Sequence, residues 1–196
     1  MQEYLAATEI IDWQHPTILK LAKELAKGQD SQSKIARVCF EWVRDNIKHS
    51  SDYQMNPVTC SASEVLQYQT GYCFAKSHLL AALLRANNIP AGFCYQRLSV
   101  FDNGAAYSLH GFNAVYLPQH SWYRIDARGN KEGVNAQCTP PQEQLAYKLN
   151  FSEEVDCQEV FARPLDIVVQ SLQKYHTWDG LRNNLPDVEK SFFNNI

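Results

Sequence analysis

Residues 71–91, GYCFAKSHLLAALLRANNIPA, decide how this chain folds. Cys73 stands two positions after Gly71 and opens a run whose leucines recur at helical spacing, which predicts a helix to about Asn87. Pro90 lies just beyond this run, and a proline soon after the last periodic residue is typical of a helix end. The stretch therefore places a thiol in the first turn of a strongly apolar helix.

Helical patterns precede this stretch, and strand patterns follow it. A proline near the start and a glycine past the end predict a helix between Pro16 and Gly28. Serine caps at residue 31 or 33, and the Ser61–Glu64 capping box, predict two more helices. Helices followed by a small antiparallel sheet give an α+β fold. The strands are predicted at residues 91–100, 110–117 and 122–127, the last two joined as a hairpin.

The last third of the chain carries weaker patterns. Residues 129–142 are polar and contain glycine, proline and asparagine, so we expect a loop there. A final helix is predicted from Pro164 to Tyr175. The asparagine-rich end, which includes Pro186 and Asn195, is interpreted as a loosely attached tail.

Composition limits the class of protein. The 196 residues are 45% hydrophobic and 20% charged, which predicts one globular domain. A net charge of −3 argues against a nucleic-acid partner, which calls for concentrated positive charge. No apolar run is long enough to cross a membrane, and we do not expect a membrane as a partner. The N-terminus lacks the basic start and apolar core of a secretion signal, so we expect a cytoplasmic protein.

The six cysteines show no CxxC pair, and in a reducing compartment we expect buried free thiols. No spacing resembles a structural zinc set, so neither a metal nor another cofactor is expected. Cys73 is in a different position from the others, because free backbone N–H groups at a helix start favour a thiolate. The same N–H groups can stabilise an oxyanion on a substrate carbonyl.

A nucleophilic thiol needs a base, and the base needs an acceptor that orients it. His110 begins one predicted strand, and Asp126 lies on the next. A three-residue connection pairs Leu117 with Ser121, and this register makes His110 the diagonal neighbour of Asp126 on one face of the hairpin. A slip of one residue would put the two side chains on opposite faces.

Residues 71–91, the strands at 110–117 and 122–126, and the helix at 40–47 together resemble the transglutaminase-like superfamily. In that family a G-x-C turn begins a helix that ends in an L-L-R…G-I-P-A phrase, and a histidine strand and a W-x-x-x-D strand follow. Asn88 replaces the glycine of that phrase, and asparagine also adopts the left-handed conformation of a helix end. The Gly-Tyr-Cys-Phe run is also similar to arylamine N-acetyltransferases, a related Cys-His-Asp architecture.

The resemblance covers about residues 33–130 and implies a papain-like core there, in which the helix of the nucleophile packs on a sheet that carries histidine and aspartate. Residues 131–196 are then a C-terminal extension of the same domain, 1–196. It implies Cys73 as nucleophile, His110 as general base and acid, and Asp126 as the residue that orients His110. The implied reaction is acyl transfer at an amide bond through a thioester, with hydrolysis of a peptide, protein or small amide as the first choice. Two alternatives stay open: transfer to an amine, of transglutaminase or N-acetyltransferase type, and a non-catalytic module that binds a peptide or a partner.

Three further residues are candidates for the oxyanion or the substrate. Gln54, in the loop upstream of Cys73, is a possible oxyanion donor beside the backbone N–H of Cys73. Tyr72 either lines the cleft or packs in the core. Arg128 follows Asp126 closely, and it is either a surface charge or a group that binds a substrate carboxylate.

Overall fold

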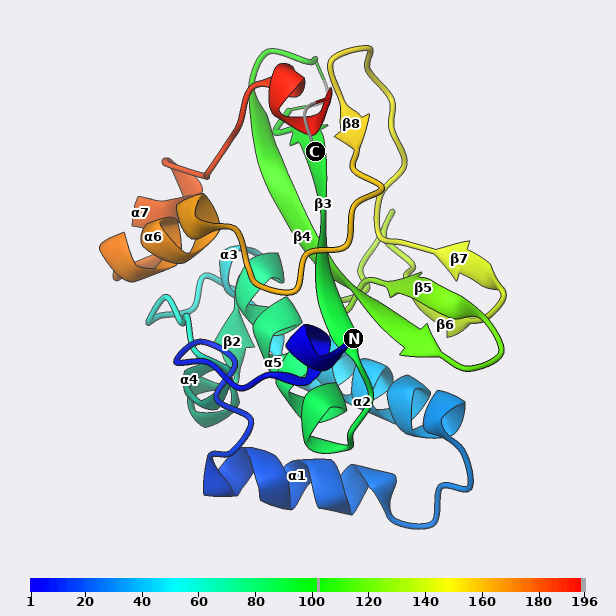
Figure 1. Ribbon diagram of the computed structural model, residues 1–196. Helices are drawn as coiled ribbons and strands as arrows, with labels where there is room; N and C mark the ends of the chain where they lie inside the picture. Colours follow the sequence, from blue (N-terminus) through cyan, green and yellow to red (C-terminus); the bar gives the residue numbers. More distant parts are fainter. Residues whose placement is uncertain (102, 195–196) are drawn as a thin grey trace.

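The computed structural model describes residues 1–101 and 103–194, and across these ranges it joins a group of helices to a four-stranded antiparallel sheet. The α+β prediction is confirmed. In Figure 1 two long strands, β3 (Ala91–Ser99) and β4 (Tyr107–Leu117), rise from the helices at the bottom. The sheet order is β5-β4-β3-β8, with the edge strands β5 (Ser121–Ile125) and β8 (Val155–Asp156).

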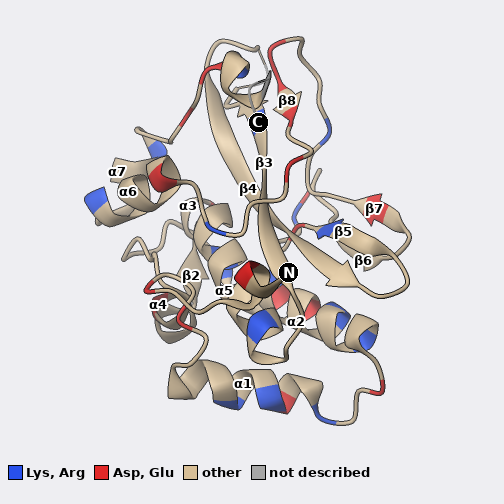
Figure 2. Cartoon of the chain, viewed as in Figure 1, with Lys and Arg blue, Asp and Glu red and all other residues tan. Residues whose placement is uncertain are grey.

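The helix that Cys73 opens, α5 (Cys73–Ala86), lies at the centre of the helical part and is buried along almost its whole length. Its neighbours begin at the predicted caps: proline stands at the first position of the first helix, Ser31 caps the second, and a complete capping box begins the third. The three helices packed against α5 are α1 (Pro16–Ala26), α2 (Gln32–Asn46) and α4 (Ala62–Tyr68). The outer side of α1 carries charged residues (Figure 2).

The approach of α5 to the sheet depends on Gly111 of β4. A Cβ atom at Gly111 would lie 2.6 Å from Cδ1 of Phe74, much closer than packed carbons approach. The Ser77 hydroxyl lies 2.8 Å from the carbonyl oxygen of Cys73 and 3.2 Å from that of Gly111, so it links the helix to the strand. The glycine therefore sets how closely the helix of Cys73 packs on the strand of His110.

The predicted hairpin register is confirmed, because Leu117 pairs with Ser121. The end of α5 also matches its prediction: Asn88 has φ +56°, the left-handed conformation expected where the family has glycine.

Two further sheets have two short strands each. Strand β1 (Lys48–His49) pairs in parallel with β2 (Thr70–Gly71), and the short helix α3 (Ser50–Tyr53) follows β1 directly. The prediction of a loop over residues 129–142 is wrong in part, because a small hairpin begins there. Its strands are β6 (Gln137–Thr139) and β7 (Gln142–Gln144).

The C-terminal part is attached more firmly than the sequence suggested. The predicted helix is present as α6 (Asp166–Lys174), and its Val168 and Leu172 belong to the main hydrophobic core. The prediction of a loose tail is wrong for residues 183–194, because the Leu109 N–H donates to the Pro186 carbonyl at 2.8 Å and Arg97 pairs with Asp187 at 2.7 Å. Asn195 lies outside the described residues. The remaining elements are η1 (Gln2–Leu5), α7 (Trp178–Arg182) and η2 (Lys190–Asn194).

All six cysteines are free and buried, as predicted. Within residues 1–101 and 103–194, no helix combines the length and the apolar character that crossing a membrane requires.

Candidate active site

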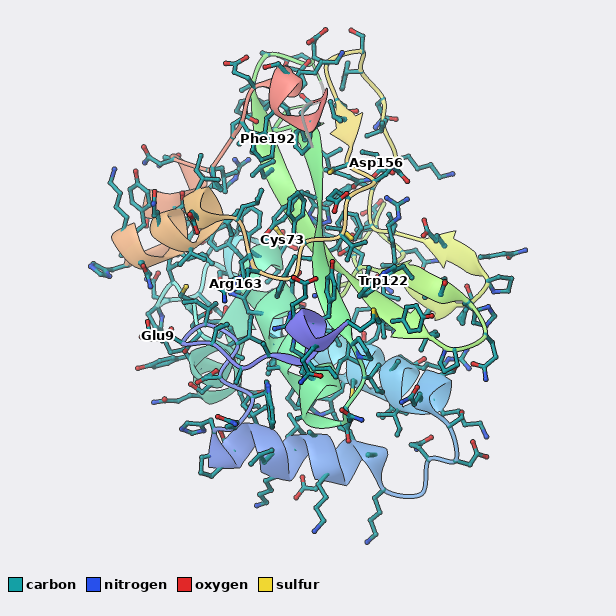
Figure 3. All side chains as sticks on the ribbon, viewed as in Figure 1. Glu9, Cys73, Trp122, Asp156, Arg163 and Phe192 are labelled. Atoms are coloured by element: carbon teal, nitrogen blue, oxygen red, sulfur yellow. The ribbon has the colours of Figure 1, made fainter. Side chains whose placement is uncertain are left out.

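Cys73 is the first residue of α5 and lies at the centre of the view in Figure 3. Cys73 is 8% exposed, and its exposed part faces a cavity of about 430 Å³, which is called the Cys73 cavity below. Tyr72 is the N-cap in extended conformation, and no described side chain caps this helix end. The N–H groups of the first turn are therefore available to a substrate oxygen in the cavity.

His110 and Asp126 meet across the hairpin as its register predicted. Nε2 of His110 lies 2.7 Å from Oδ2 of Asp126. The same carboxylate accepts backbone N–H groups from Arg128 at 3.1 Å and from Ala146 at 3.0 Å, and it is fully buried. Since Nε2 of His110 faces Asp126, Nδ1 is the nitrogen left for the thiol of Cys73, which lines the same cavity.

His110 and Asp126 each shift the pKa of the other towards the charged form. Burial lowers the pKa of His110, but the Asp126 carboxylate and the Cys73 side chain outweigh burial and raise this pKa above its ordinary value. Burial likewise raises the pKa of Asp126, but His110 and the two backbone N–H groups outweigh it and lower this pKa. The raised pKa of His110 and the lowered pKa of Asp126 both favour an imidazolium paired with a carboxylate.

Aromatic rings fix the plane of the His110 imidazole. Phe112 stacks on it at a ring-centroid distance of 5.8 Å, and Tyr147 meets it edge to face at 5.0 Å. The Arg128 guanidinium lies over the Tyr147 ring, 5.8 Å from its centroid.

The structure brings Tyr72 and Arg128 to the Cys73 cavity and leaves Gln54 outside it. Tyr72 lines the cavity and donates its hydroxyl to the Trp178 carbonyl at 2.5 Å. Gln54 is exposed at the end of α3 and is not among the described residues that line the cavity.

Arg128 is no surface charge, because it is only 6% exposed and forms a two-pronged ion pair with Asp52. Lys131 adds a second cation to the same carboxylate at 2.9 Å. These cations lower the pKa of Asp52, although its partial burial raises it.

His49 is a site residue that no pattern in the sequence marks as buried. It is 8% exposed, lines the Cys73 cavity and meets Tyr72 edge to face at 5.4 Å. Burial and the nearby Arg128 hold the pKa of His49 well below 6.5, so this histidine is neutral. The parallel pair that buries it, His49 with Gly71, joins two-residue strands and leaves no periodic signal in the sequence.

Lys76 is a second buried group that no pattern in the sequence singles out. Its ammonium donates to the carbonyls of Ile47 and Arg44, which ties the end of α2 to α5 beside His49. Burial and the Arg128 charge lower the pKa of Lys76 to about 7.

Another wall of the Cys73 cavity comes from the C-terminal part of the chain. Residues between β7 and β8, at the end of α7 and just after α7 contribute both apolar and charged side chains to it. Its main members are Tyr147, Lys148, Phe151, Glu154, Arg182 and Leu185.

A thiol in the first turn of a central helix, with a histidine–carboxylate pair on the adjacent antiparallel sheet, defines a papain-like architecture. The family model described as the transglutaminase-like superfamily matches residues 19–127, more than half of the chain. The chain therefore belongs to the transglutaminase-like superfamily. No curated protein sequence matches it.

Several solved structures of longer proteins are similar to this chain. A candidate cysteine protease from Cytophaga hutchinsonii is similar with a TM-score of 0.51 and 24% identity, over 64% of this chain and 40% of that one. The periplasmic domain of TgpA from Pseudomonas aeruginosa gives 0.48 and 18%, over 63% and 45%. Red sea bream transglutaminase gives 0.45 and 9%, over 60% and 27%. The chain thus spans less than half the length of each of these proteins.

Proposed function

We propose that this chain is a thiol-dependent acyl-transfer enzyme in which Cys73 is the nucleophile, His110 the general base and acid, and Asp126 the residue that orients His110. The observation that carries the proposal is the position of His110, which is hydrogen-bonded to Asp126 through Nε2 and lines the same cavity as Cys73. A nucleophile, a base and an orienting acceptor are the three groups that such a reaction needs.

The reaction follows from these positions. The Cys73 thiolate attacks an amide carbonyl, an S–C bond forms, and the carbonyl oxygen takes the negative charge. The backbone N–H of Cys73, at the start of α5, is the proposed hydrogen-bond donor to this oxyanion. His110 gives its proton to the leaving nitrogen, the C–N bond breaks, and a thioester remains on Cys73.

The second half of the reaction decides the product. Water, deprotonated by His110, attacks the thioester and releases an acid and the free thiol. We propose hydrolysis of a peptide, protein or small amide, in keeping with the candidate protease among the similar structures. An amine in place of water would make the chain a transglutaminase-type or N-acetyltransferase-type acyltransferase, and this is the second candidate.

We also propose that residues 1–196 act as one domain, because the extension contributes both to the core and to the cavity wall. A cytoplasmic location remains a prediction.

The test is site-resolved alkylation of Cys73 by iodoacetamide against pH, read by mass spectrometry in the wild type and in His110→Ala. The other cysteines serve as internal controls, because burial raises the pKa of each, to about 12 for Cys39 and Cys60 and to about 11 for Cys138. We expect Cys73 to react selectively at about pH 6, and the variant to react at least about tenfold more slowly there. Slow labelling that does not depend on His110 would favour the non-catalytic binding module instead.

A further inference from the structure

The Cys73 cavity is positively charged in a protein whose net charge is −3. Among the described residues that line it are four permanent cations and two carboxylates, and His49 is neutral because its pKa is held well below 6.5. The cations are Arg128, Lys131, Lys148 and Arg182, and the carboxylates are Asp52 and Glu154.

Both carboxylates are already engaged by the protein. Asp52 pairs with Arg128 and Lys131. Glu154 accepts three backbone N–H groups, from Ser99 at 2.8 Å, Asn150 at 2.5 Å and Phe151 at 3.0 Å, and so it folds the loop that forms the cavity wall. Neither carboxylate is left to neutralise a further cation.

Arg182 and Lys148 have no such partner. In the described part of the chain, no carboxylate forms an ion pair with either side chain. Arg182 is half-buried at the end of α7, whereas Lys148 is exposed. A half-buried guanidinium without a counter-charge is costly unless a ligand supplies one.

The position of Arg182 is built into the fold. Tyr72, the residue before Cys73, donates its hydroxyl to the Trp178 carbonyl in the same short helix as Arg182. The Trp178 N–H in turn donates to the Asn56 side chain at 2.7 Å. One hydrogen bond with the buried Tyr72 and one with the exposed Asn56 therefore hold α7, and with it Arg182, at the cavity that contains Cys73.

We propose that the Cys73 cavity binds substrates that carry a carboxylate, with Arg182 as the main anchor and Lys148 as a second cation. The guanidinium offers a two-pronged pairing geometry that suits a carboxylate. Leu98, Val100 and Leu185 line the same cavity, so the part of the substrate between the carboxylate and the reacting carbonyl is expected to be apolar. The carboxylate belongs to an acidic side chain or to a free peptide C-terminus. This inference rests on the proposed function for the chemistry at Cys73.

The test compares two alkylating reagents on Cys73: N-iodoacetyl-β-alanine, which carries a carboxylate, and its neutral N-methylamide. The measured quantity is the ratio of their labelling rates, determined in the wild type and in Arg182→Gln. We expect the acid to react faster in the wild type and the ratio to fall about tenfold in the variant, the effect of one charge-assisted hydrogen bond. Arg182→Lys keeps the charge and should recover part of the ratio.

Arg163→Gln is the matched control, because Arg163 is exposed and does not line the cavity in the described residues. It should leave the ratio at the wild-type value. A ratio near one in the wild type, or one unchanged in Arg182→Gln with a native circular-dichroism spectrum, overturns the proposal. Failure of the proposed function has a different signature: both reagents label slowly and without dependence on His110, while their ratio can still be measured at higher pH.

Two peptides distinguish the sources of the carboxylate by protecting Cys73 from iodoacetamide. One has an internal glutamate and an amidated C-terminus, and the other is neutral with a free C-terminus. The peptide that protects better in the wild type, and loses protection in Arg182→Gln, identifies the source. Absence of protection by both contradicts the proposal.

Discussion

The Cys73 cavity has two walls that the protein holds in place by different means. The wall with His110 and Asp126 belongs to the sheet. There the fully buried Asp126 carboxylate accepts hydrogen bonds from the His110 imidazole and from two backbone N–H groups. The wall formed by the extension, at residues 147–154 and 182–185, is held by hydrogen bonds and ion pairs that are partly open to water. One such pair is Arg97–Asp187, in which the aspartate side chain is 32% exposed.

This difference separates chemistry from recognition. Proton transfer between Cys73 and His110 requires positions fixed within a fraction of an ångström, which a buried hydrogen-bonded sheet provides. A binding wall tolerates larger changes, because it selects a substrate without taking part in bond making. Substitutions in the sheet wall should therefore stop the reaction, and those in the extension wall should change which substrate is preferred.

Asp126→Asn should have the largest effect. The amide cannot stabilise an imidazolium at His110, and it favours the wrong tautomer, so we expect acyl transfer to fall by about 10³-fold or more. Without the carboxylate, burial dominates at His110 and lowers its pKa, so the histidine should lose its proton at lower pH than in the wild type. Turnover measurements together with an NMR titration of the His110 ring check both parts.

The same substitution has a signed effect on stability against pH. The folded pKa of His110 is raised, so its stabilising contribution is complete below its unfolded value and is lost as pH rises through the folded one. The folded pKa of Asp126 is lowered, so its contribution is lost as pH falls through that value. The loss in free energy of unfolding from Asp126→Asn should be largest between about pH 4 and pH 6.5, measured by urea unfolding. A loss that grows steadily towards alkaline pH would contradict the ion pair.

The sheet wall could largely be predicted from the sequence because its determinants are local. A three-residue hairpin connection fixes the pairing of Leu117 with Ser121, and that register alone places His110 beside Asp126. The helix start at Cys73 is likewise marked by the residues next to it.

The rest of the cavity depends on contacts between distant segments. His49 is buried by a two-residue parallel pair with Gly71, and parallel pairs this short leave no pattern in either segment. The hydrophilic end of the chain predicts a loose tail, yet Asp187 accepts a hydrogen bond from Arg97, which lies 90 positions away in the sequence. Arg182 lies at the cavity on α7, whose Trp178 carbonyl accepts the Tyr72 hydroxyl from 106 positions away in the chain.

Gly111→Ala should have an intermediate effect, and it tests how closely α5 must approach the sheet. The new Cβ would lie 2.6 Å from Cδ1 of Phe74, so the helix of Cys73 has to shift or the phenyl ring has to move. We expect a loss of about 1–3 kcal/mol in free energy of unfolding and a drop in the labelling rate of Cys73.

The control for this glycine is Gly133→Ala in the extension, where a Cβ would meet nothing within 4 Å and only the positive φ of +76° is unfavourable. That variant should lose about 1 kcal/mol and keep the wild-type rate at Cys73. Equal rate losses in the two variants would mean that the approach of α5 to β4 does not control the thiol.

Asp187→Asn should have the smallest effect and most directly tests the weaker wall. It removes the charge that Arg97 holds at 2.7 Å, but Arg97 keeps its hydrogen bonds to the Val188 and Glu153 carbonyls at 2.9 and 3.1 Å. For a partly exposed pair we expect a loss of less than about 1 kcal/mol, together with faster amide hydrogen exchange at residues 185–188.

Asp30→Asn is the matched control for this last variant, because the Asp30–Lys34 pair has the same 2.7 Å length but both side chains are more than half exposed. It should change neither the stability nor the exchange at residues 185–188. If Asp187→Asn slowed iodoacetamide labelling of Cys73 as strongly as Asp126→Asn, the two walls would act as one unit. Faster exchange confined to the extension, with Cys73 reacting at its wild-type rate, would instead show that the reacting groups keep their positions while the binding wall loosens.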